Sequence, residues 1–87
     1  IAFAKSLARE VSRYQINVNC VCPGPTDTPL LQTRPEKMLE ALIAAIPLRR
    51  FAKPEEIAHA IQFFAAEGSE YITGQVLSVS GGLTMGD

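Results

Sequence analysis

The chain has 87 residues, of which 47% are hydrophobic, and its net charge at pH 7 is −1. This balanced charge gives no electrostatic footprint for nucleic acid or for an anionic membrane surface. No apolar run approaches the ~18 residues that suggest a membrane span, and the first residues lack the basic leader and cleavage site of a signal peptide.

The first half of the chain is predicted to form a helix, a short strand and a polar loop. Apolar residues recur at helical spacing from residue 1 to about residue 13. Residues 16–22 are short and rich in β-branched side chains, as expected of a strand. That strand must end at Pro23-Gly24-Pro25, since proline cannot continue a sheet ladder. Residues 26–32 then read as a loop with an apolar tip.

The second half is predicted to form two helices and a last strand. Thr33 and Glu36 have the spacing of a capping box before a helix over residues 35–46. Pro54 suits the first position of the next helix, which Gly68 would end. We expect the buried face of this second helix to consist of Ile57, Ile61, Phe64 and Ala65. The last strand, residues 75–80, is closed by two glycines.

The element order is therefore helix, strand, helix, helix, strand. Two short apolar strands suit a parallel sheet that helices cover on both faces, but two strands cannot form such a sheet alone. We therefore expect an α/β fold in which residues 1–87 form the edge of a larger doubly wound parallel sheet. The chain also lacks an initiator Met and opens within an apolar helical pattern, which indicates a segment of a longer protein.

The loop Pro23–Thr28 carries the most unusual chemistry of the sequence. In doubly wound sheets ligands bind beyond the carboxyl ends of the strands, and this loop follows such an end. Pro23 and Pro25 restrict the backbone, whereas Gly24 allows a ligand or another backbone to come close. A rigid loop with two threonines suits a planar carboxamide, which needs one donor and one acceptor. The alternative is an ordinary capped turn with solvated threonines.

Three blocks of the chain, residues 17–28, 47–58 and 71–82, resemble the short-chain dehydrogenases/reductases in order and spacing. The resemblance implies a Rossmann-type fold, NAD or NADP as cofactor, and hydride transfer to or from a secondary alcohol or ketone. It also implies a cytoplasmic homo-oligomer, a dimer or a tetramer, with a small-molecule substrate. The residues that match the family's cofactor-binding loop are Pro23, Gly24, Thr26 and Thr28.

Other family motifs are missing from the chain. There is no Gly-x-x-x-Gly-x-Gly loop, and Lys5 has Ile1 rather than Tyr four residues before it. The resemblance thus implies that residues 1–87 are the C-terminal segment of one domain, whose dinucleotide-binding half and catalytic Tyr-x-x-x-Lys lie before Ile1. No catalytic residue is assigned, and we expect the chain alone to be inactive. The alternative is a non-catalytic assembly or pseudoenzyme module.

The resemblance also implies that the region after the loop covers the substrate, with Leu30, Leu31 and Met38 as candidates to line a hydrophobic pocket. The alternative is ordinary core packing. The surrounding basic residues are either solvated charges or an anchor for a substrate phosphate; they are Arg34, Lys37, Arg49, Arg50 and Lys53. The anchor reading follows from a similarity to a family member that oxidises a cyclic hydroxyacyl-CoA. Cys20, Cys22 and His59 lack the partners of a metal or catalytic site, so we predict reduced thiols and a surface or interface imidazole.

Overall fold

The computed structural model describes residues 1–85, which form five helical segments and two strands. The helix α1 (Ala2–Val11) continues into a single 3-10 turn, η1 (Ser12–Tyr14). The strand β1 (Cys20–Pro23) follows, and then come the short helix α2 (Pro29–Gln32) and the helix α3 (Glu36–Ala45). The helix α4 (Pro54–Ala65) leads back to the strand β2 (Val76–Val79). The order confirms the predicted α/β arrangement, with α2 as an addition.

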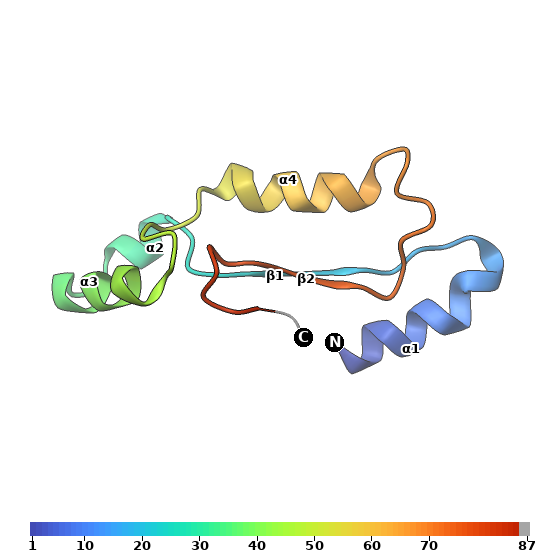
Figure 1. Ribbon diagram of the computed structural model, residues 1–87, viewed down its shortest axis with the longest axis horizontal. Coiled ribbons are helices and arrows are strands. Elements are labelled where there is room, and N and C mark those ends of the chain that lie inside the picture. The colour runs from blue at the N-terminus through green and yellow to red at the C-terminus, as the bar shows by residue number, and fades with distance from the viewer. Residues whose placement is uncertain (86–87) are drawn as a thin grey trace.

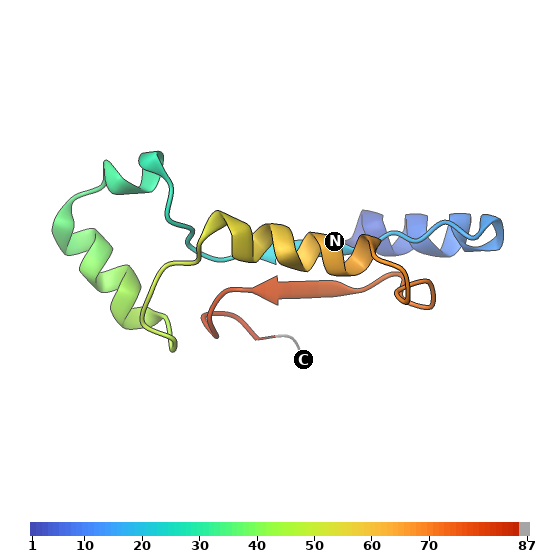
Figure 2. The same cartoon turned by 90° about the horizontal axis from the view of Figure 1, so that it is seen from above.

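The two strands are parallel neighbours, with Cys20 opposite Val76 and Pro23 opposite Val79. In the two views α4 runs along one side of this pair and α1 lies on the other side (Figures 1 and 2). α2 and α3 extend beyond the carboxyl ends of the strands (Figure 1). Within residues 1–85 β1 pairs with β2 alone, so its opposite edge has no strand beside it. This is the partial doubly wound sheet that the sequence predicts.

β1 is shorter than the predicted strand over residues 16–22, because asparagine side chains replace the ladder in its first part. The Asn19 side chain donates to the Ile72 carbonyl and accepts from the Gln75 amide, both at 3.0 Å. The Asn17 side chain donates to the Glu70 carbonyl at 3.0 Å. These side chains hold the loop before β2 against the chain before β1, so regular backbone pairing begins only at Cys20.

The helix starts differ in part from the sequence expectations. The predicted capping box at Thr33 and Glu36 is wrong: Pro35 is the N-cap of α3, and the Thr33 hydroxyl donates to the Leu30 carbonyl at 2.7 Å. That bond belongs to the last turn of α2, in a stretch expected to be loop. Pro54 does occupy the first turn of α4, as predicted.

The core of the described residues is small. Among residues 1–85, only Ala8, Ile46 and Ala60 are buried apolar residues. On α4, Ile57 and Phe64 are half-buried, but Ile61, predicted to be buried, is 54% exposed, and Ala65 is also exposed. Residues 1–85 therefore cover only part of the predicted face and leave Ile61 and Ala65 open. Helical periodicity identified the apolar face but not what packs against it. No helix in this part of the chain is long and apolar enough to cross a bilayer.

Candidate functional site

The loop of residues 23–28, here called the PG loop, leaves β1 and packs against the end of β2. The Gly24 amide donates to the Val79 carbonyl at 2.9 Å. A Cβ atom at Gly24 would lie 2.8 Å from the Ser80 Cα atom, which is closer than carbon atoms in proteins approach one another. Glycine is therefore required here by the close approach of two backbones, and this contact fixes the start of the loop.

The middle of the PG loop is held by a second backbone segment. The Ala52 amide donates to the Pro25 carbonyl at 3.0 Å, and the Asp27 amide donates to the Ala52 carbonyl at 2.8 Å. These two bonds form an isolated parallel bridge between Thr26 and Ala52. A trans peptide directs its N–H and C=O groups to opposite sides, and no peptide bond is cis in the described part of the chain. The N–H and C=O of Thr26 therefore point away from Ala52.

This arrangement leaves Thr26 with one backbone donor and one acceptor on the open side of the loop. Neither group is hydrogen-bonded to another residue within the described range 1–85. The Thr26 hydroxyl donates to the Gly24 carbonyl at 3.0 Å, which braces the turn internally. Thr26 is half-buried. The geometry offers a fixed donor and acceptor pair of the kind that a primary carboxamide requires.

Thr28 ends the PG loop and caps the helix α2. Its hydroxyl accepts the Leu31 amide at 3.3 Å, and Pro29 follows at the first helical position. A hydroxyl that accepts one hydrogen bond can still donate its own hydrogen. The cap thus fixes the Thr28 side chain without using its donor. The sequence indicated a ligand contact for Thr28 with a capped turn as the alternative; in the structure its hydroxyl caps α2, a helix in a stretch that was predicted to be loop.

A charged side-chain pair stabilises the connector that bears Ala52. The two guanidinium nitrogens of Arg50 donate to the two carboxylate oxygens of Glu56, at 2.6 and 2.8 Å. The same carboxylate accepts the Lys53 amide at 2.9 Å. The hydrogen bonds from Arg50, and next the one from Lys53, lower the pKa of Glu56 from 4.5 to about 2. Glu56 is thus ionised at neutral pH and closes the connector between residues 50 and 56.

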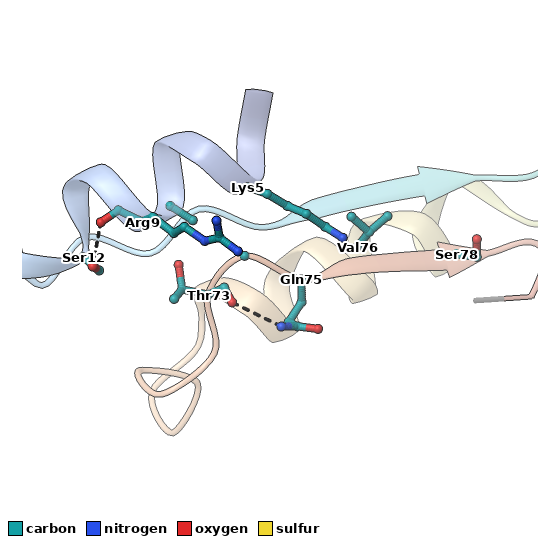
Figure 3. Close-up of a pocket in the computed structure, with 9 residues that line it drawn as sticks. Lys5, Arg9, Ser12, Thr73, Gln75, Val76 and Ser78 are labelled. Atoms are coloured by element: carbon teal, nitrogen blue, oxygen red, sulfur yellow. Dashed lines mark hydrogen bonds between the residues drawn. The ribbon is translucent and has the colours of Figure 1, made fainter. Parts of the chain in front are cut away.

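Two hollows lie at opposite ends of the strand pair. The larger, of about 660 Å³, lies between α1 and the segment that leads into β2, away from the PG loop. Lys5, Arg9 and Ser12 lie on one side of it, and Thr73, Gln75 and Ser78 on the other (Figure 3). A smaller hollow of about 130 Å³ adjoins the PG loop, and Pro25, Ala52, Arg50 and Glu56 contribute to its wall. Size alone would select the first hollow. The second lies on the Ala52 side of the PG loop, whereas the Thr26 N–H and C=O point to the opposite, open side.

The predicted cofactor residues lie in one continuous loop, and the predicted substrate-loop residues follow it on α2 and α3. Pro23, Gly24, Thr26 and Thr28 all lie in the PG loop. Leu30 on α2 is 70% exposed and Met38 on α3 is 48% exposed, whereas Leu31 is half-buried. These two helices extend from the loop at the same end of the strands (Figure 2).

The remaining predicted residues separate into different environments. Arg50 belongs to the ion pair with Glu56, so its guanidinium is engaged. Arg49 has a left-handed backbone, with φ of 59°. Cys20 and Cys22 are half-buried free thiols, and His59 is exposed on α4. The Arg50–Glu56 pair is not evident from the sequence. The separation of six residues between Arg50 and Glu56 matches neither the contact spacing of a helix nor that of a strand. The hydrogen bond from the Lys53 amide to Glu56 was also not expected, because lysine is not a usual residue at the start of a helix.

Known proteins match this chain over nearly its whole length. A family model described as enoyl-(acyl carrier protein) reductase matches residues 1–84. The 3-oxoacyl-[acyl-carrier-protein] reductase FabG of Thermotoga maritima is 45% identical over 85 residues, which are 98% of this chain and 35% of that protein. The acetoacetyl-CoA reductase of an Acinetobacter species is 45% identical over 85 residues, covering 98% and 34%.

A third relative has a different kind of substrate in its name. The 3α-hydroxysteroid dehydrogenase of Mediterraneibacter gnavus is 48% identical over 77 residues, which are 88% of this chain and 31% of that protein. The chain therefore spans about a third of the length of these relatives.

Proposed function

We propose that this chain, which belongs to the short-chain dehydrogenase/reductase family, forms the nicotinamide end of an NAD(P) site in a longer oxidoreductase. The observation that carries the proposal is the orientation of Thr26, whose backbone N–H and C=O both point to the open side of a braced loop. The loop follows the carboxyl end of a parallel strand, which is where doubly wound folds bind their ligands.

The residues of the PG loop fit a carboxamide by their hydrogen-bonding chemistry. The Thr26 amide would donate to the carboxamide oxygen, and the Thr26 carbonyl would accept from the carboxamide nitrogen. The Thr28 hydroxyl would add a donor, while Pro23 and Gly24 keep the loop against β2. When bound, the nicotinamide ring supplies or accepts the hydride. The role of these residues is to fix the orientation of the ring before reaction, which is how proximity contributes to catalysis.

For the substrate we propose a secondary alcohol or ketone in a 3-hydroxyacyl or 3-oxoacyl thioester. Two relatives are named as reductases of a 3-oxoacyl-carrier protein and of acetoacetyl-CoA, and both names describe a ketone on a thioester. Exposed Leu30 and Met38 would contact the acyl chain. Arg49 stays a candidate for a CoA phosphate contact, whereas Arg50 is engaged by Glu56. The similarity to a cyclic hydroxyacyl-CoA dehydrogenase stays a prediction.

The catalytic pair and the dinucleotide-binding half are proposed to precede Ile1 in one continuous domain. The edge of β1 that has no strand beside it within residues 1–85 is the surface that this part would cover. Sequencing the natural protein tests this point directly. A Tyr-x-x-x-Lys motif just before Ile1 supports the enzyme, and its absence favours a non-catalytic assembly module.

The cofactor proposal is tested with the natural full-length protein and two substitutions at one position. Thr28→Ala removes the hydroxyl, and Thr28→Ser retains it. We expect Thr28→Ala to raise the KM for NADH or NADPH about tenfold, as the loss of one useful hydrogen bond would. Thr28→Ser should stay near wild type. If both variants keep the wild-type KM, the PG loop does not hold the nicotinamide.

The substrate class is tested in the same assay by comparing acetoacetyl-CoA with a 3-oxosteroid. Turnover of the thioester alone supports the proposal, and turnover of the steroid alone contradicts it.

A homo-oligomer is proposed as well, since Phe3 on α1 is 79% exposed and Phe63 on α4 is 52% exposed. Light scattering of the full-length protein measures the subunit number. A cytoplasmic location stays a prediction.

A further inference from the structure

We propose that Arg50 and Glu56 are positioning residues for cofactor binding, because their ion pair holds the connector that fixes the PG loop. Ala52 and the Arg50–Glu56 pair are here called the clip. This inference rests on the proposed role of the PG loop as the nicotinamide site. It assigns a function to two charged residues that lie outside that loop.

The clip acts first on the connector itself. The carboxylate of Glu56 accepts three hydrogen bonds: two from Arg50 and one from the Lys53 amide. Arg50 also donates to the Phe51 carbonyl at 3.2 Å. Charge-assisted bonds in a bidentate geometry define both distance and direction. Residues 50–56, which pass from an irregular connector into α4, are therefore closed into one ring with Ala52 inside it.

The ring then acts on the PG loop through the backbone of Ala52. Its amide and carbonyl bind the residues on either side of Thr26, at 3.0 and 2.8 Å. These are the two bonds that turn the Thr26 N–H and C=O toward the open side. Arg50 and Glu56 also line the hollow of about 130 Å³ together with Pro25 and Ala52. The ion pair thus lies behind the loop, on the side away from the proposed ligand.

Both charged side chains are well exposed, with 51% of Arg50 and 40% of Glu56 accessible. Exposed ion pairs generally contribute little to global stability. An exposed pair can still affect ligand binding when it maintains a binding-competent conformation, because apparent affinity scales with the population of that conformation. We therefore expect the clip to matter for the nicotinamide more than for folding.

The experiment uses the natural full-length protein and two nucleotides that differ at one end. NADH or NADPH reaches the PG loop with its nicotinamide, whereas ADP-ribose, or its 2′-phosphate, lacks that ring. Glu56→Gln removes one charge at nearly constant size, and Arg50→Gln removes the guanidinium group and shortens the side chain. We expect each variant to weaken NAD(P)H binding about fivefold, at the low end of couplings between sites, and to leave ADP-ribose binding unchanged. Calorimetric titration measures both dissociation constants.

Glu55→Gln is the matched control, because Glu55 is an exposed acid in the same first turn of α4. It should bind both nucleotides as the wild type does. The double variant, with glutamine at both positions, should bind NAD(P)H no more weakly than either single variant. Either single substitution already breaks the ion pair, so the second removes no further interaction.

The outcomes separate the clip from the proposed function. Equal weakening of NAD(P)H and ADP-ribose would mean a general structural role and would overturn the positioning role. Wild-type affinity of Glu56→Gln for both nucleotides would overturn it as well. Thr28→Ala is measured in parallel: if it loses NAD(P)H affinity while Glu56→Gln does not, the clip fails and the PG loop stands. If Thr28→Ala retains full affinity, the proposed function fails.

Discussion

Gly24→Ala introduces a methyl group where two backbones touch. The new Cβ would lie 2.8 Å from the Ser80 Cα atom and 2.9 Å from the Ser80 Cβ atom. Reaching the 3.4 Å at which ordinary contacts begin requires a displacement of 0.6 Å, from 3.4 minus 2.8. Ser80 is buried, with 8% of its surface accessible, so neither backbone can yield without moving its neighbours.

The displacement also stretches an existing bond. The Gly24 amide lies 2.9 Å from the Val79 carbonyl, and 0.6 Å of separation along that direction would bring it to the limit of a hydrogen bond. Overpacking of a tight contact lowers the free energy of unfolding by about 1–3 kcal/mol. The weakened hydrogen bond accounts for about 0.5–1.5 kcal/mol of that decrease. We expect Gly24→Ala to lower the free energy of unfolding by about 2 kcal/mol.

Urea denaturation of the natural full-length protein measures this change, and Gly68→Ala provides the comparison. Gly68 has φ of +97° and no atom within 4 Å of its would-be Cβ, so only backbone strain acts there. Gly68→Ala should cost about 1 kcal/mol and leave nicotinamide affinity unchanged. Gly24→Ala should lose both stability and affinity. A Gly24→Ala protein as stable as the wild type would refute the argument from close approach.

Three further predictions concern the surroundings of the PG loop. Asn19→Ala should lower the free energy of unfolding by about 2 kcal/mol, as urea denaturation would show, because the Ile72 carbonyl and the Gln75 amide lose their partner. Arg49→Gly should raise the melting temperature in calorimetry, since φ of 59° is strained for arginine; a lower melting temperature would contradict this. The pKa of Glu56 is lowered from 4.5 to about 2, so its stabilising contribution, which solvent screening keeps small, is present above pH 4.5 and is lost as the pH falls toward 2. Urea denaturation over this range should therefore show the wild type approaching Glu56→Gln, and a difference independent of pH would exclude the ion pair as its cause.

The family was recognisable from the sequence, and the comparisons confirm it. The three blocks that carried the resemblance lie within residues 17–82, and the matching family model covers residues 1–84. The oxidoreductase assignment of the relatives agrees with the expected class.

The sequence by itself determined the features that depend on neighbouring residues. Pro23-Gly24-Pro25 ended the first strand, Pro54 began α4, and the alternation of helices and strands indicated a parallel pair. Each of these follows from local backbone restrictions or from periodicity. Such signals act within a few residues and do not depend on what packs against them.

Only the tertiary structure decided which groups meet across long separations in the sequence. The bridge between Thr26 and Ala52 orients the candidate ligand groups, yet nothing in either local sequence requires that pairing. The Asn19 side chain shortened the strand by binding a loop more than fifty residues away. Ile61 belonged to an apolar face by periodicity but is exposed in residues 1–85. Burial depends on the surfaces that a folded chain brings together, and periodicity can only show which face needs a partner.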